Sequence, residues 1–236
     1  MNKLPILLTL LLTSVFTGYG QCSNPFYTME EGRHYQVESY NGKDKLEATM
    51  EYTVSSVNEI NNGYEATIAS KTLDKKGKEV ASGDMVVMCQ DGVLKMDIQG
   101  LLNAMKQLRE TKGMDIDIQG DHLSIPASLD VGDTLPSSTT TMTMKTEDNS
   151  MTMSTMNFTI NQRTVAAQED LTTAAGTFPC YKITYTMDMN VKVMGMGRTT
   201  SYTGAEWIAE GVGMVRNEQY DADGALSSYS VLTKAE

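Results

Sequence analysis

Apolar and polar residues alternate along most of this chain with a period of two. Such alternation is typical of strands that bury one face, because successive side chains point to opposite sides of a strand. Turn pairs follow several of the runs, with Asn-Gly at 41–42 and Asp-Gly at 91–92, and short turns of this kind predict antiparallel hairpins. The expected strands are 34–40, 46–57, 64–72, 79–89, 114–120, 123–125, 139–146, 151–165, 177–193, 198–208, 213–220 and 225–233.

One segment, residues 100–113, departs from this pattern. Leu101, Met105 and Leu108 recur there at the spacing of one helical face. Gly113 stands where a helix would end. The apolar stripe of such a helix must pack on an apolar surface, and the inner face of the sheet provides one. We therefore expect a mainly β (α+β) fold, an antiparallel sheet with one helix packed against it.

The first twenty residues have the order of a secretory signal peptide. Lys3 is followed by an apolar run over 4–16, and small residues precede Gln21. The run is too short for a transmembrane anchor, which needs about 20 apolar residues. The sequence predicts a signal peptide over 1–20 that is removed, and a single domain over 21–236. We expect an exported protein, periplasmic or secreted, that does not span a membrane.

Charge narrows the classes of partner. The 236 residues include 19 Lys+Arg and 30 Asp+Glu, for a formal net charge of −11. Nucleic acids and anionic lipid surfaces are bound through clustered Lys and Arg, so the acidic balance argues against both. We expect no nucleic-acid partner.

The three cysteines are Cys22, Cys89 and Cys180. Disulfides persist outside the cytosol, and an odd count allows one bridge with one thiol left over. We expect a Cys22–Cys89 bridge that holds the N-terminal segment, although spacing alone leaves the other pairings open. Cys22 also raises the question of lipid attachment, but Gln21 stands where lipoprotein processing requires Gly, Ala or Ser. A protein without a lipid anchor is therefore favoured.

Methionine is unusually frequent, with 18 residues. Three interpretations are open: a copper(I) site of thioethers, a flexible lining for apolar ligands, or ordinary core packing. His34 and His122, which could complete a copper site, lie far along the chain from the methionine pairs. Four Met-x-Met pairs occur, at Met142/Met144, Met151/Met153, Met187/Met189 and Met194/Met196.

Catalytic motifs are missing from the sequence. It contains no HExxH, no GxSxG and no glycine-rich phosphate loop. Its carboxylates mostly fall at strand ends and turns, where solvated surface residues are usual. We expect a non-enzymatic protein with no cofactor and no metal centre.

Several short stretches with a recognisable pattern are spread from the start to the end of the mature chain. They are Cys22-Ser-Asn-Pro-Phe-Tyr27 with Gly32, Ala175-Gly-Thr-Phe-Pro-Cys180-Tyr-Lys-Ile183, Trp207, Gly211-Val-Gly213-Met-Val215 and Tyr220-Asp-x-x-Gly224-x-Leu226. Together they resemble a TapB-like family of exported bacterial proteins of unknown function, whose fold is related to the lipoprotein carrier LolA. The resemblance implies a curved antiparallel sheet or half-open β-barrel, with one helix packed on the concave face and a cavity that takes acyl chains in such carriers.

These observations favour an envelope protein that binds an apolar or lipid-like ligand between sheet and helix. One alternative is a structural or protein-interaction module with a filled core and an envelope protein as its partner, and a lesser one is copper(I) binding through methionine. The expected ligand-binding residues are Trp207, Met105, Leu101, Phe178, Met187 and Met189.

Overall fold

The computed structural model describes residues 22, 24–27, 29–96, 114–146, 151–193 and 196–236. These residues form strands and connections and contain no helix. The helix expected over 100–113 and the signal peptide expected over 1–20 lie outside the described residues. The first seven strands are β1 (His34–Asn41), β2 (Leu46–Ile60), β3 (Gly63–Asp74), β4 (Glu79–Gln90), β5 (Val93–Met96), β6 (Met114–Gly120) and β7 (Leu123–Ile125). The others are β8 (Thr134–Leu135), β9 (Ser138–Thr146), β10 (Thr152–Thr173), β11 (Gly176–Val193), β12 (Met196–Ala209), β13 (Gly213–Tyr220) and β14 (Leu226–Ala235).

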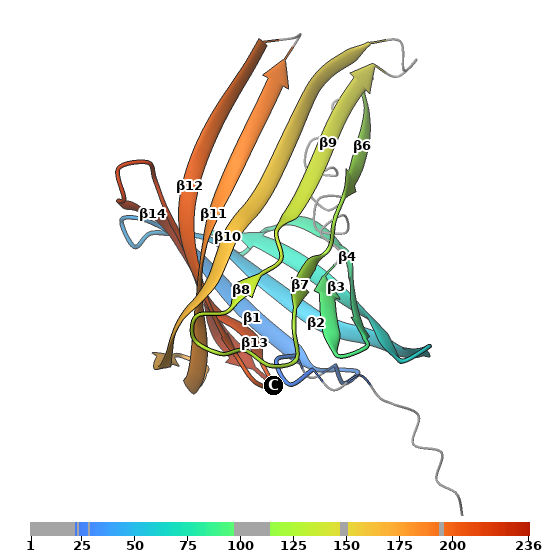
Figure 1. Ribbon diagram of the computed structural model, residues 1–236, viewed down its shortest axis with the longest axis vertical. Coiled ribbons are helices and arrows are strands. Elements are labelled where there is room, and N and C mark those ends of the chain that lie inside the picture. The colour runs from blue at the N-terminus through green and yellow to red at the C-terminus, as the bar shows by residue number, and fades with distance from the viewer. Residues whose placement is uncertain (1–21, 23, 28, 97–113, 147–150, 194–195) are drawn as a thin grey trace, which may run out of the picture.

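All the strands belong to one 14-stranded antiparallel sheet. The order across it is β6-β9-β10-β11-β12-β13-β14-β1-β2-β3-β4-β5-β7, and β8 pairs with β10. In the described part of the chain the sheet does not close, because β6 and β7 are its two edges. Figure 1 shows β9 to β12 rising as a tall wall, with β1 to β4 running across it at a steep angle. The mainly β, antiparallel architecture expected from the alternation is therefore confirmed, as is the incompletely closed sheet that the resemblance implied.

The hairpin turns lie where the turn residues predict them. Asp91 and Gly92, between β4 and β5, have φ values of 51° and 81°, as both central residues of a type I′ turn require. Gly63 begins β3, and a Cβ atom there would lie 1.8 Å from the carbonyl oxygen of Cys89. Glycine at this position therefore lets β3 and β4 approach each other.

Strand β10 is longer than the alternation predicts, because it continues from Val165 to Thr173. This continuation pairs with β11, for example Asp170 with Pro179 and Leu171 with Phe178. Its residues are mostly exposed, so no buried face imposes alternation on them. Pairing with β11 determines the structure here, and local propensity does not.

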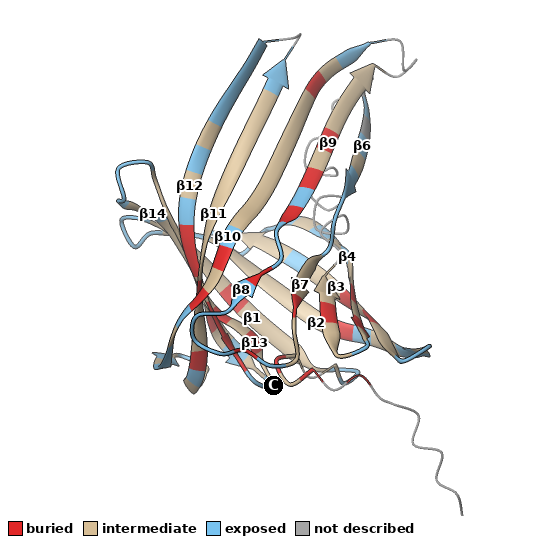
Figure 2. Cartoon of the chain, viewed as in Figure 1, coloured by how far each residue is buried: buried red, intermediate tan, exposed pale blue. Residues whose placement is uncertain are grey.

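The main core cluster lies between the two halves of the curled sheet. It joins Val54 and Leu94 of the β1–β5 half to Ile183 and Ile208 of the β10–β12 half. Phe26 of the N-terminal segment is only 1% exposed and fills the space between them. Figure 2 shows most of the buried residues at the lower end of the long strands, with a few higher on β9 and β10, whereas the upper ends of β11 and β12 are exposed.

Candidate ligand-binding cavity

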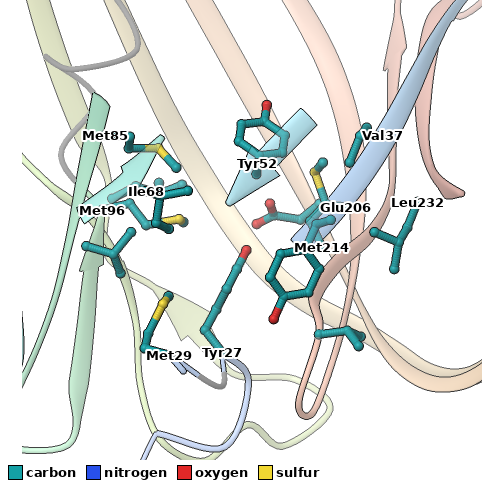
Figure 3. Close-up of a pocket in the computed structure, with 14 residues that line it drawn as sticks. Tyr27, Met29, Val37, Tyr52, Ile68, Met85, Met96, Glu206, Met214 and Leu232 are labelled. Atoms are coloured by element: carbon teal, nitrogen blue, oxygen red, sulfur yellow. The ribbon is translucent and has the colours of Figure 1, made fainter. Parts of the chain in front are cut away.

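A cavity of about 240 Å³ lies beside this core, between the two halves of the sheet. Its wall is mainly aliphatic, aromatic and thioether surface, and Figure 3 shows the side chains converging on it from opposite strands. Pockets of this character are typical of sites for apolar small molecules. The lining residues are Tyr27, Met29, Tyr35, Val37, Tyr52, Ile68, Met85, Val87, Met96, Leu123, Glu206, Val212, Met214 and Leu232.

Strand alternation places these side chains on the inner face. Tyr35 and Val37 of β1 are two residues apart, as are Met85 and Val87 of β4, so each pair points to one side of its strand. The rest of the wall comes from β12, β13 and β14, which follow in sequence only after more than half of the chain. Strand β14 lies next to β1, where Leu232 pairs with Val37. Curling of the sheet brings the two sets together.

Glu206 on β12 is the one charged residue among those that line the cavity. Its side chain is 13% exposed, and Figure 3 shows the carboxyl oxygens directed toward the middle of the cavity. Burial raises the pKa of the Glu206 carboxyl, and the nearby Arg163 opposes that rise. The cavity therefore has an apolar wall with one strong acceptor group.

Arg163 supplies the counter-ion of Glu206 from β10. Its side chain is 1% exposed, and its Nη2 lies 3.3 Å from Glu206 Oε1. The Nη1 group donates hydrogen bonds to the carbonyl oxygens of Ser124, at 2.9 Å, and Pro136, at 3.2 Å. The β10–β11 register shifts just before Thr164, and Gln162 has a φ of 51°, a bulge geometry that redirects a side chain. The bulge accounts for a buried Arg in an otherwise alternating strand.

Gly213 admits Tyr27 to the cavity wall. The φ of Gly213 is +76°, and a Cβ atom there would lie 2.1 Å from the Tyr27 ring, so only glycine fits both the backbone and the contact. Burial, with a smaller contribution from the negative charge of Glu206, raises the pKa of the Tyr27 hydroxyl well above its ordinary value. Tyr27 is therefore uncharged at neutral pH.

The structure does not bring Trp207 and Phe178 to this cavity. Trp207 follows Glu206 on β12, so the two side chains point to opposite faces of the sheet. On that other face Trp207 belongs to a second, smaller cluster with Phe178 packed against it. The indole Nε1 donates a hydrogen bond to Glu169 Oε1 at 2.7 Å, and Lys182 Nζ lies 4.7 Å from the ring centroid. These contacts explain why the tryptophan is held away from the cavity.

The other expected ligand residues divide into two groups. Ile183 of β11 pairs with Glu206 and therefore faces the same side of the sheet. Met187 and Met189 follow Ile183 at even spacing on the strand, so their side chains share this inner face. They are half-buried and stand beyond the residues that line the cavity. Leu101 and Met105 lie outside the described residues. The tyrosines Tyr27, Tyr35 and Tyr52, and the carboxylate of Glu206, were not anticipated, although alternation placed most of them on strands.

The disulfide joins Cys22 to Cys89, with their Cα atoms 5.6 Å apart. This pairing is the one expected from the sequence. It fastens the N-terminal segment to β4, next to Phe26 and Leu94 in the main core cluster. Cys180 is a free, buried thiol in the second cluster on the opposite face.

Cys180 should resist alkylation in the folded protein. Burial, followed by the charges of Asp170 and Glu169, raises the pKa of its thiol to about 11, so only about one thiol in a thousand is ionised at pH 8. We expect negligible modification by iodoacetamide at pH 8 and full modification in denaturant. The rate of modification of the folded protein should rise about tenfold per pH unit toward pH 10. Mass spectrometry of the intact protein measures this, and rapid labelling of the native protein at pH 8 would contradict it.

Metal ligands do not gather in the described part of the chain, where no three His, Cys, Asp or Glu side chains form a group that could hold an ion. The methionines of the Met-x-Met pairs differ in exposure: Met151 and Met196 are exposed at strand ends, whereas Met142 is buried on β9. Copper(I) binding through thioethers stays an untested prediction. Among the residues that the structure describes, none belongs to a helix long and apolar enough to cross a bilayer.

Comparisons with known proteins agree with this architecture. The sequence model of a family described as DUF3108-like matches residues 30–232. A solved structure from Bacteroides fragilis, named as an exported protein with a YmcC-like fold, is 27% identical, with a TM-score of 0.70 over 89% of this chain and 98% of that one. A structure from Parabacteroides distasonis, named as a lipoprotein, is 26% identical, with a TM-score of 0.73 over 92% of this chain and 100% of that one. A search of curated protein sequences finds no match.

Proposed function

This chain belongs to the DUF3108-like family, and we propose that it is an exported envelope protein that holds an apolar or amphipathic molecule in the cavity between the two halves of its sheet. The observation that carries the proposal is the cavity itself, whose wall is apolar apart from Glu206 and the tyrosine hydroxyls. Apolar surface left unfilled between two walls forgoes packing contacts, and a bound apolar molecule restores them.

The composition of the wall suits a ligand of variable shape. Met29, Met85, Met96 and Met214 contribute thioether side chains, which are unbranched and adapt to irregular partners. This use of methionine corresponds to the flexible lining considered from the sequence, although different methionines supply it. We also propose that the cavity corresponds to the one that takes acyl chains in lipoprotein carriers of the LolA type.

One observation supports export, and another argues against a lipid anchor on Cys22. Similar solved structures carry the names of an exported protein and a lipoprotein. The Cys22 sulfur is bonded to Cys89, and a sulfur in a disulfide cannot also form the thioether that links a lipid to cysteine. We therefore place the protein in the periplasm or outside the cell, in a compartment where this disulfide persists.

Filling the cavity tests the proposal. Replacement of Met85 with tryptophan (M85W) adds a large ring at the cavity wall, and we expect it to weaken binding of decanol by at least about tenfold, or about 1.4 kcal/mol. Val80 lies on the same strand, is 39% exposed and does not line the cavity. Its replacement (V80W) is therefore the matched control and should leave binding unchanged. Isothermal titration calorimetry measures the affinity.

Native mass spectrometry of the protein purified from its own envelope adds an independent result. A lipid-sized adduct that is lost on denaturation and missing from M85W supports the proposal. A bare mass, together with no decanol binding by the wild type, overturns it. That outcome would favour the interaction module, for which the exposed Met151, Val193 and Met196 at the ends of neighbouring strands are candidate contacts.

A further inference from the structure

We propose that the ligand carries an uncharged hydrogen-bond donor, a hydroxyl or amide group, that binds the Glu206 carboxylate while its apolar part fills the cavity. This inference rests on the proposed function and adds the chemical class of the ligand. It follows from the juxtaposition of one buried ion pair with an otherwise apolar wall.

Only one partner of the ion pair faces the cavity. Glu206 lines the cavity, whereas Arg163 does not. The Arg163 guanidinium lies behind the wall, with Nη1 bound to two backbone carbonyl oxygens and Nη2 to Glu206 Oε1. The group that a ligand meets is therefore a carboxylate, which accepts hydrogen bonds and donates none when ionised.

The Glu206 carboxylate can accept further hydrogen bonds. Within the described residues, the hydrogen bond to Arg163 engages Oε1, and none is recorded at Oε2. Figure 3 shows the carboxyl group between Tyr27 and Tyr52, toward the middle of the space. An ionised oxygen in apolar surroundings gains more from a donor than the same oxygen does in water.

A charged head group on the ligand is unfavourable in this cavity. Arg163 and Glu206 together carry no net charge, so a ligand ammonium would bring an unbalanced charge into an apolar cavity at high desolvation cost. A carboxylate or phosphate would pay the same cost and would also be repelled by Glu206. A neutral donor loses its hydrogen bond to water and recovers it from the carboxylate.

Three probes with the same chain distinguish these head groups on the unmodified protein. Decanol has a donor, decyl methyl ether lacks it, and decanoate is an anion. We expect decanol to bind about tenfold more tightly than the ether, the ratio that one hydrogen bond to a charged acceptor supports. Decanoate should bind more weakly than either neutral probe. Calorimetric titration of the three ligands gives the ratios.

A variant pair then assigns the preference to one residue. E206Q replaces the ionised acceptor by a neutral amide, and we expect the decanol-to-ether ratio to fall to about threefold or less. Glu169 is an exposed carboxylate bound to the Trp207 indole on the opposite face of the sheet. E169Q is therefore the matched control and should keep the wild-type ratio.

The outcomes separate the two proposals. Equal binding of decanol and its ether by the wild type, or tightest binding of decanoate, overturns the donor inference and leaves the proposed function standing. Failure of all three probes to bind, together with a bare mass of the protein from its own envelope, overturns the proposed function itself. If E206Q does not fold, the comparison of decanol with its ether on the wild type decides the inference alone.

Discussion

Replacement of Arg163 with methionine (R163M) is expected to lower the free energy of unfolding by about 3–5 kcal/mol, because it leaves the Glu206 carboxylate buried without its counter-ion. Removal of both partners is a different case. A double variant that replaces them with apolar residues (R163M/E206L) should recover most of the loss, since no buried charge remains. Urea denaturation at pH 7 with the disulfide intact measures both free energies.

The pH dependence of R163M identifies the cause of its instability. Burial already raises the pKa of the Glu206 carboxyl, and Arg163 is the group that opposes the rise. Without Arg163 the folded-state pKa stands further above the unfolded value, so the folded protein binds the proton more tightly than the unfolded chain. The deficit of R163M should therefore shrink as the pH falls through the folded-state pKa toward the unfolded one. A deficit that is equal at pH 7 and pH 4.5, or a double variant as unstable as R163M, would contradict the counter-ion explanation.

Loss of the Cys22–Cys89 disulfide is expected to cost about 4 kcal/mol of unfolding free energy, the value that closing a loop of this length implies. The two cysteines are 67 residues apart in sequence, and the bridge restricts the unfolded chain over that distance. The double replacement C22A/C89A removes it. Thermal or urea unfolding of this variant, compared with the oxidised wild type, gives the difference.

The reduced wild type is the control for that experiment, because it keeps both sulfur atoms and loses only the bond. We expect it to be about as unstable as C22A/C89A, with the variant slightly lower because Cys89 is completely buried. Addition of reductant to C22A/C89A should change nothing. A reductant that leaves the wild type unaffected would show that the bridge contributes no stability.

The alternation of residues predicted most strands to within a few positions, and the Asp-Gly and Asn-Gly turns located the hairpins. Both signals are local: one buried face imposes a period of two, and tight turns favour Asn, Asp and Gly. Gly92 has the positive φ of such a turn, whereas in the turn after β1 the positive φ falls on Asp44 and not on Gly42. Where neither signal operates the prediction stopped early, as at the exposed end of β10 after Val165. The two-residue strand β8 was missed for the same reason, since it pairs at a bulge in β10.

The candidate site was the part that sequence reasoning anticipated least. Trp207 was expected at the ligand and Glu206, its neighbour, was not, although they point to opposite faces of β12. Period-two alternation divides residues into two sets but does not say which set faces inward when both faces carry buried clusters. Here both faces do, with Ile208 in the main cluster and Trp207 in the smaller one.

Most strands, the turns and the export of the protein were predictable from the sequence, because each depends on residues that are close together in the chain. The sequence also anticipated the Cys22–Cys89 pairing, which the structure confirms. Long-range contacts in the folded protein set which face of the sheet encloses a cavity and bring Arg163 to Glu206 there. Those contacts join residues 43 positions apart, on strands brought together by the curl of a 14-stranded sheet, and no local pattern encodes that curl.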